Sequence, residues 1–263
     1  MLRRLAGQWS FREASARAGH ITTANAAVPD GQRVYAIGDI HGRFDLASNM
    51  VAMIHKDLAE TAKGLDATVV GLGDFIDRGP QSRQVLELLC ALRQETGLRF
   101  VGIQGNHEAM FMSMLDRPGA SLKEWLSFGG TETLASYGIG GAGRMTPAAL
   151  REEISRRMPL EHLLFLQGLR LSESIGDYFF CHAGARPGIP LSRQEKRDLL
   201  WIGTGFSDRD AAFEKVIVHG HTRCPVAEIH RHRISLDTGA HTTGVLSCAV
   251  LEGSAIRLLK CSQ

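Results

Sequence analysis

Residues 33–42, RVYAIGDIHG, begin with a short apolar run that is typical of a buried strand and end in a glycine-flanked turn. The turn carries Asp39 and His41. The same arrangement recurs at residues 68–79, TVVGLGDFIDRG, and at residues 99–108, RFVGIQGNHE. Three strands, each followed at once by glycine and ligand-type side chains, therefore organise the first part of the chain.

Helical patterns separate these three strands. Residues 46–62 and 82–95 carry apolar residues at spacings of three and four, as Val85, Leu88, Leu89 and Leu92 illustrate. Strands that alternate with helices indicate an α/β domain with the strands in a central layer.

The remainder of the chain divides into three parts. Residues 109–170 have the pattern of successive short helices and are expected to form a helical insertion. Residues 1–32 lack apolar periodicity and end in the turn cluster Pro29, Asp30 and Gly31, so we expect a flexible tail and a domain over residues 33–263. Further strands are predicted at residues 178–181, 216–219, 233–236, 247–251 and 255–259.

Composition excludes several classes of protein. The chain has 263 residues, 44% of them hydrophobic, and a net charge of +2, which favours an ordinary globular protein and gives no indication of a nucleic-acid or membrane partner. No apolar run is long enough for a transmembrane helix, and Gln8 and Ser10 interrupt the only candidate for a secretory signal. The five cysteines form no CxxC pair, so we expect a reducing, cytoplasmic location.

Two later strands also end in ligand-type residues: YFFCHAG (178–184) contains His182, and VIVHGHT (216–222) contains His219 and His221. In open α/β sheets, ligands bind at the carboxyl ends of strands, so all five polar clusters can converge on one crevice. Carboxylate, imidazole and amide donors suit manganese, iron or zinc better than calcium or copper(I). The donors outnumber those that one tetrahedral ion takes, which favours two ions that activate a bridging water for phosphoester hydrolysis.

The motifs GDIHG, GDFIDRG, GNHE, CHAG and HGHT, in this order, resemble the calcineurin-like metallophosphoesterases. The DRG in the second motif resembles the corresponding motif of the phosphoprotein phosphatase branch of this family. That branch includes bacterial and bacteriophage Ser/Thr phosphatases. The resemblance covers residues 33 to about 240. It implies a two-layered β-sandwich flanked by helices, with metals at the strand ends and the helical insertion beside the mouth of the site.

The resemblance also implies a role for individual residues. Asp39 and His41 would bind the first metal and Asp74 would bridge, with two divalent ions expected, manganese first and iron or zinc as alternatives. The ligands of the second metal would be Asn106, His182 and His221.

His107 becomes the general acid by the same resemblance, with Asp77 orienting its imidazole. Arg78 would bind the substrate phosphate through its planar fork of donors, and the Asn106 amide would assist.

Neighbouring positions are expected to have supporting or structural roles. His219 lies on the opposite strand face from His221 and is expected to pack or to support the ligands. Asp237 and His241 follow another strand and could be hydrogen-bonded supports of the metal ligands. Glu108 is expected to face a helix start, and Cys181 to fill core space.

One position departs from the family pattern. Similar bacterial sequences carry a second phosphate-binding Arg after a Trp-Ile pair, and here that pair, residues 201–202, is followed by Gly203. Arg186 or Arg209 could compensate, or Arg78 could act alone. Because a bidentate phosphate contact is missing, we expect Gly203→Arg to raise kcat/KM on phosphopeptides.

The leading interpretation is a manganese-dependent phosphoprotein phosphatase acting on phosphoserine or phosphothreonine. A symmetrical bis(5'-nucleosyl)-tetraphosphatase shares the same motifs, and a phosphotyrosine preference is also open, because fold and motif do not determine substrate. GDFIDRG looks more like the protein phosphatases. A noncatalytic metal-binding scaffold would have no use for His107 paired with Asp77. The oligomeric state is left open.

Overall fold

The computed structural model describes residues 21–263 except residues 63, 117–121, 204–205 and 207–210. Two five-stranded sheets form its centre. The first sheet is mixed: β1, β2 and β3 are parallel, and β9 pairs antiparallel with both β1 and β10. Its strands in spatial order are β10 (Ala255–Ser262), β9 (Val245–Glu252), β1 (Gln32–Ile37), β2 (Asp66–Gly71) and β3 (Leu98–Gly102).

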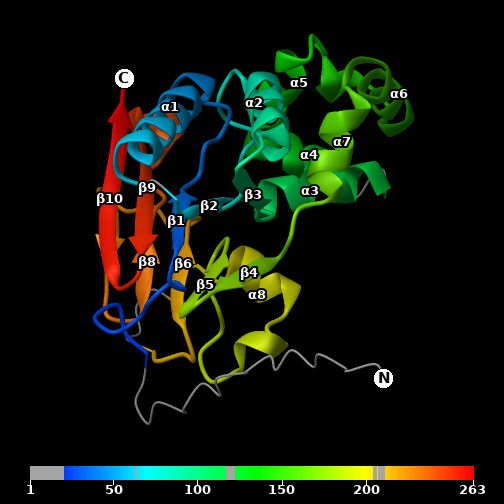
Figure 1. Ribbon diagram of the computed structural model, residues 1–263. Helices are drawn as coiled ribbons and strands as arrows, with labels where there is room; N and C mark the ends of the chain where they lie inside the picture. Colours follow the sequence, from blue (N-terminus) through cyan, green and yellow to red (C-terminus); the bar gives the residue numbers. More distant parts are fainter. Residues whose placement is uncertain (1–20, 63, 117–121, 204–205, 207–210) are drawn as a thin grey trace, which may run out of the picture.

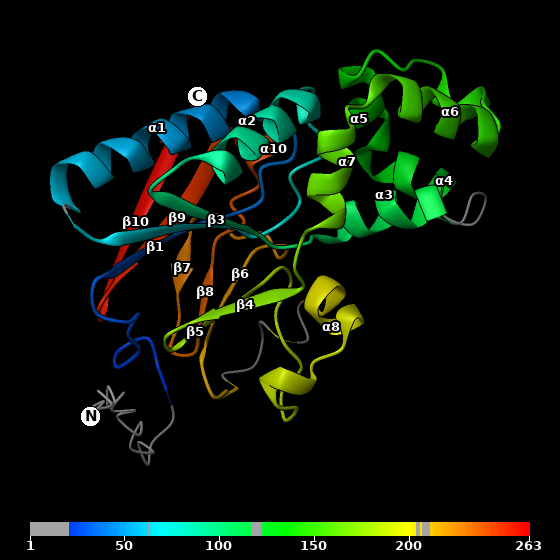
Figure 2. The ribbon, with the colours of Figure 1, turned by 45° about the vertical axis from the view of Figure 1, so that its right-hand side comes forward.

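The second sheet has a parallel centre, β5, β6 and β8, with an antiparallel strand at each edge. Its strands in spatial order are β4 (Ser172–Ile175), β5 (Tyr178–Cys181), β6 (Val216–His219), β8 (Arg233–Ser235) and β7 (Glu228–Ile229). Figures 1 and 2 show this sheet packed beneath the first.

Side-chain alternation along the strands produces the layers. On β1, Val34 and Ala36 face the second sheet and join Val218 of β6 in the core between the sheets. Tyr35 and Ile37 point to the other side, into the core beneath the helices. The first sheet is therefore buried on both faces, which explains the continuous apolar runs that identify its central strands.

Two long helices, α1 (Phe44–Thr61) and α2 (Ser82–Gln94), cover the outer face of the first sheet (Figure 2). The chain between β3 and β4 forms a helical lobe to one side. Its elements are α3 (Asn106–Asp116), α4 (Leu122–Trp125), the π-helical turn η1 (Leu126–Gly130), α5 (Thr131–Ser136), η2 (Ala142–Arg144), α6 (Pro147–Arg157) and α7 (Leu160–Gln167). Short helices elsewhere are η3 (Leu191–Arg193), α8 (Lys196–Trp201) and α10 (Ala240–Thr243).

The expected α/β sandwich with flanking helices is confirmed. Strands β4 and β7 were not predicted, because β4 is largely polar and β7 has only two residues. The packed domain begins earlier than the expected boundary at residue 33, since Ala26 and Val28 are buried in the core between the sheets. Residues 1–20 of the expected tail lie outside the described residues. None of the described helices has the length and hydropathy needed to span a membrane.

Candidate metal centre

The predicted ligand residues follow the carboxyl ends of parallel strands in both sheets. Asp39 and His41 follow β1, and Asp74 follows β2. His182 and His221 follow β5 and β6 of the second sheet. Because the two sheets pack face to face, the strand ends of both meet at one edge of the sandwich, beside the helical lobe.

Unusual backbone conformations concentrate at this edge. Among the described residues, the non-glycine residues with positive φ are all predicted site residues: His41, Asp74, Asp77, Arg78 and His221, with φ between 47° and 71°. Such conformations cost free energy, and they persist where the surrounding structure enforces them, typically at functional sites. The strained turns after β1, β2 and β6 therefore fix the orientation of the predicted site side chains that they carry.

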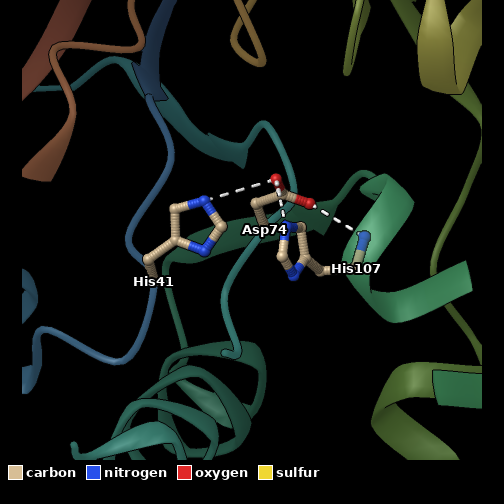
Figure 3. Close-up of side chains that lie close together, drawn as sticks. All are labelled: His41, Asp74 and His107. Carbon is tan, nitrogen blue, oxygen red and sulfur yellow. Dashed lines mark hydrogen bonds and ion pairs between the residues drawn. The ribbon is translucent and has the colours of Figure 1, made fainter. Parts of the chain in front are cut away.

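Asp74 lies at the centre of the cluster, and its two oxygens face different groups. Oδ2 lies 3.4 Å from His41 Nε2 and 3.9 Å from His107 Nε2, while Oδ1 accepts a hydrogen bond from the His107 backbone N–H (Figure 3). Oδ1 also lies 3.4 Å from His182 Nε2. The two oxygens of one carboxylate thus lie near different imidazoles, His41 and His107 on one side and His182 on the other, as expected of a bridging ligand.

Asn106 belongs to the second set. Its Oδ1 lies 2.9 Å from His182 Nε2 and 3.1 Å from His221 Nδ1. Two groups of donors emerge, and within each group the ligand atoms lie within 4.8 Å of one another. The first group is His41, Asp74 and His107; the second is Asp74, His182 and His221.

The hydrogen bonds of the imidazoles test whether these residues fit a metal. His41 Nδ1 lies 3.0 Å from the Ile76 carbonyl and His182 Nδ1 lies 2.8 Å from the Leu72 carbonyl, so each Nδ1 must carry the proton. In the neutral imidazole, the form that binds metals, each Nε2 therefore presents a lone pair to an oxygen of Asp74. Lone pairs that face one another across about 3.4 Å repel unless a cation lies between them, so the donor set fits divalent metal ions.

Asp39 is held on the other side of the cluster. Both of its oxygens accept a hydrogen bond from the His221 backbone N–H, and a Cβ at Gly220 would strike Oδ1 at 1.9 Å, which explains the glycine in HGHT. Burial and the nearby charges of Asp237 and Asp74 raise the pKa of Asp39 well above its usual value. Several carboxylates in so small a buried space stay ionised only when positive charge lies close by.

The predicted acid, His107, is fully buried and paired with Asp77, with 2.7 Å between Nδ1 and Oδ2. Trp125 Nε1 and Thr133 Oγ1 donate to the two Asp77 oxygens at 2.8 and 2.6 Å. His107 Nε2 forms no hydrogen bond among the described residues and faces the Asp74 carboxylate, 3.9 Å from Oδ2. Burial lowers the pKa of His107, but the charge of Asp74 and the bond to Asp77 outweigh it and raise the pKa overall.

Glu108 ties the β2 turn to the start of α3. Its carboxylate accepts hydrogen bonds from the backbone N–H groups of Asp74, Phe75 and Gly105, at 2.7 to 2.9 Å. Burial, then the charge of Asp74, raises the pKa of Glu108 to about 7. The sequence predicts Glu108 at a helix start, and the structure adds that its carboxylate holds the backbone of Asp74, the predicted bridging ligand, in position.

The predicted phosphate-binding residue Arg78 is half-buried on a turn packed against Gly129, whose carbonyl accepts its backbone N–H. Within the described ranges its guanidinium forms no ion pair. Arg186 is unsuited to compensate for Gly203, because it forms a two-point ion pair with Asp198, at 2.6 and 2.7 Å. Arg209 lies outside the described residues.

The supporting residues lie close to their expected places. The rings of His41 and His241 are 4.9 Å apart, and buried Asp237 lies near enough to Asp39 to affect its pKa. His219 bonds to Ser235 and to the Gly220 carbonyl rather than to the cluster. Cys181 is buried in the core on the outer face of the second sheet.

Three residues of the site lay beyond sequence reasoning: Trp125, Thr133 and Phe128. The first two contact Asp77 from 48 and 56 residues away in sequence, and the Phe128 ring lies edge-on to His107 at 6.1 Å. All three lie in the helical lobe. No local motif marks them, because their partners are brought near only by the packing of that lobe.

The fold and the cluster define a metallophosphoesterase. A family model described as calcineurin-like phosphoesterase matches residues 32–243, so the chain belongs to this family and is a hydrolase of the phosphoesterase class. The chain is 33% identical to serine/threonine-protein phosphatase 2 of Escherichia coli over 82% of this chain and 91% of that protein. It is 29% identical to an asymmetrical bis(5'-nucleosyl)-tetraphosphatase of Bacillus velezensis, over 77% and 82% of the two chains.

Among solved structures, a putative diadenosine tetraphosphatase superposes with a TM-score of 0.59 at 21% identity, covering 90% of this chain and 98% of that chain. A cold-active protein tyrosine phosphatase of a Shewanella species superposes with a TM-score of 0.55 at 15% identity, covering 90% and 82%. At these identities the likeness concerns the fold alone.

Proposed function

We propose that the protein is a serine/threonine protein phosphatase that hydrolyses phosphomonoesters with water activated by two divalent metal ions. The observation that carries this proposal is the position of His107: its Nε2 is buried, makes no hydrogen bond among the described residues and faces Asp74, while Nδ1 is bound to Asp77. A noncatalytic scaffold would not need an imidazole oriented in this way.

In this proposal Asp39 and His41 would hold the first ion, Asn106, His182 and His221 would hold the second, and Asp74 would contribute to both sites. The ions, manganese or alternatively iron or zinc, would supply a nucleophilic oxygen at neutral pH and neutralise the phosphoryl oxygens. Asp39 takes its place among the ligands by the family resemblance, since it belongs to neither of the two groups of closely spaced donors.

His107 donates a proton from Nε2 to the leaving-group oxygen, so that the serine or threonine departs as a neutral alcohol. Asp77 keeps the proton on Nδ1 and stabilises the charged imidazolium before transfer. Arg78 binds the phosphoryl oxygens, and the Asn106 amide orients them. Phe128, 39% exposed and edge-on to His107, narrows the approach to this acid.

The choice of a protein substrate rests on the GDFIDRG motif and on the 33% identity to the E. coli phosphatase. The second candidate is a bis(5'-nucleosyl)-tetraphosphatase, favoured by the B. velezensis relative, whose name specifies asymmetrical cleavage rather than the symmetrical cleavage expected from sequence. A phosphotyrosine preference is the third. The proposal includes a reducing, cytoplasmic location, supported by five unpaired, buried cysteines.

The deciding experiment measures manganese-supported phosphate release from phosphoserine, phosphothreonine and phosphotyrosine peptides beside diadenosine tetraphosphate, with His107→Asn as control. Preferential release from phosphoserine or phosphothreonine, lost in the variant, supports the proposal. Dominant cleavage of the dinucleotide overturns the substrate assignment and leaves the metal-ligand proposal standing. Metal binding without turnover of any substrate would favour the scaffold.

A further inference from the structure

Arg223 directly follows the HGHT motif, and its side chain folds back toward the site. Its Cδ and Nε pass 3.5 Å from the position a Cβ would take at Gly239, and its terminal nitrogen donates a hydrogen bond to His241 Nε2 at 2.5 Å. Arg223 is exposed and forms no ion pair with a carboxylate among the described residues. The Arg223 side chain therefore lies along the loop that carries Gly239.

His241 connects Arg223 to the metal cluster. Its ring packs edge-on against His41, and its Nδ1 is buried with no partner within the described part of the chain, so Arg223 provides the one hydrogen bond found for this ring. The guanidinium is therefore one imidazole away from a predicted metal ligand. The charges of Arg223 and Arg78 both act on His241, lowering its pKa to about 4 together with the larger effect of burial.

We propose that Arg223 is the second phosphate-binding arginine of this site and takes over the role that Gly203 leaves empty. It contributes charge and donors from the β6–β7 loop, and Arg78 contributes them from the β2–α2 loop. Like the assignment of Arg78, this inference rests on the proposed phosphoesterase chemistry. The ligand is the phosphoryl group itself, or the orthophosphate product.

The alternative residues for this role are unsuitable on structural grounds. Arg186 is engaged by Asp198, which is almost fully buried and would lose its partner if Arg186 turned away. When it reaches for a phosphate, Arg223 gives up its bond to the His241 imidazole, and its charge, which also acts on buried Asp237, stays in the same loop. A guanidinium prefers a phosphate dianion to a neutral acceptor, because charge-assisted, two-point hydrogen bonds are stronger.

The test compares Arg223→Ala and Arg223→Lys with Arg231→Ala, an equal change of charge at an exposed residue before β8, at the far end of that strand from Asp237. Orthophosphate binding to the manganese-loaded protein is measured by calorimetry, and KM and kcat are measured on p-nitrophenyl phosphate. We expect Arg223→Ala to weaken phosphate binding and raise KM about tenfold, as loss of a charge-assisted contact predicts. Arg223→Lys should recover part of the loss, and Arg231→Ala should stay within twofold.

Manganese content separates phosphate binding from support of His241. A normal metal content with weakened phosphate binding supports the proposal. Loss of metal in Arg223→Ala, unchanged phosphate affinity, or an equal loss in Arg231→Ala would overturn it. Calorimetry with orthophosphate needs no assumption about the natural phosphoester, so the proposal can fail while phosphopeptides are hydrolysed, or succeed while they are not.

Discussion

Trp125 donates a hydrogen bond from its indole Nε1 to Asp77 Oδ2 at 2.8 Å, and that same oxygen accepts from His107 Nδ1. Both side chains are fully buried. This hydrogen bond connects the helical lobe to the proposed general acid. Without the indole, the Asp77 carboxylate would lose one of the hydrogen bonds that hold it against His107. The lobe that sequence predicts only as a helical insertion thus helps to orient the proposed catalytic pair, His107 and Asp77.

Trp125→Phe tests this connection, since it keeps an aromatic ring and removes the donor. We expect kcat on p-nitrophenyl phosphate to fall about tenfold with KM little changed, and stability to fall by about 1–3 kcal/mol, because a buried carboxylate loses a hydrogen bond. The matched control is Phe111→Leu, which disturbs the ring packed 5.2 Å from Trp125 and no hydrogen bond of Asp77. An equal loss of kcat in the control would attribute the effect to packing.

Asp77→Asn should change the pH dependence of kcat as well as its size. The Asp77 charge is one of the influences that raise the pKa of His107. His107 acts in its protonated form, so activity declines as pH rises through this pKa, and the neutral amide should move the decline to lower pH. A pH profile of kcat measures the shift; an unmoved alkaline limb would contradict the assignment.

His107→Asn removes the proposed general acid itself and is the reference for the Trp125→Phe and Asp77→Asn variants. It should lower kcat by about 100-fold to 10,000-fold, the range for removal of a general acid. Its metal content should equal that of the wild type. His107 also belongs to a group of closely spaced donors with His41 and Asp74, so a loss of one metal ion in His107→Asn would make His107 a ligand instead.

The sequence predicts those parts of the fold and site that short motifs encode. Strand β1 and the predicted ligands Asp39 and His41 are contiguous in sequence, so one short motif encodes both the strand and the side chains that follow it. Contacts such as Thr133 with Asp77 depend on how the lobe packs, and nothing near Thr133 in sequence signals them. Likewise, Ala26 is buried only because the two sheets pack around it, and the local sequence does not indicate this packing.

Glu108→Gln should destabilise the protein and lower its activity. The carboxylate uses both oxygens to accept backbone N–H groups, including that of Asp74, whereas an amide would turn its own N–H₂ toward one of these donors. We expect a loss of about 1–3 kcal/mol for the unsatisfied groups, measured by urea unfolding. Glu60→Gln, at a side chain that is 62% exposed, provides the control and should have no measurable effect.

Metal removal should lower the thermal stability, because Asp39, Asp74 and Asp237 then share a buried space without cations. One ion at 100 times its Kd contributes about 2.7 kcal/mol, which corresponds to about 5–11 °C in Tm for a chain of this size. Calorimetric scans before and after chelation, and after manganese is restored, measure the effect. Asp74→Asn should reduce the manganese-dependent shift, while Asp30→Asn, at an exposed turn, should leave it intact; a shift that survives in Asp74→Asn would exclude the bridging role.

Gly203→Arg can be tested most sharply in the Arg223→Ala background. Gly203 has φ of +54°, and among the described residues a Cβ there would meet only the Trp201 carbonyl oxygen, at 3.8 Å. An arginine is therefore accommodated by these residues but adopts a backbone conformation costing about 1 kcal/mol. If the two arginines serve one phosphate, Gly203→Arg should recover most of the kcat/KM on phosphopeptides that Arg223→Ala loses, and should raise kcat/KM less in the wild type, where Arg223 is already present. Gly203→Ala carries the same backbone cost without the guanidinium and should rescue nothing. Mutational effects add when two residues are independent and fail to add when they share a partner. Equal gains from Gly203→Arg in both backgrounds would therefore mean that the two arginines act independently.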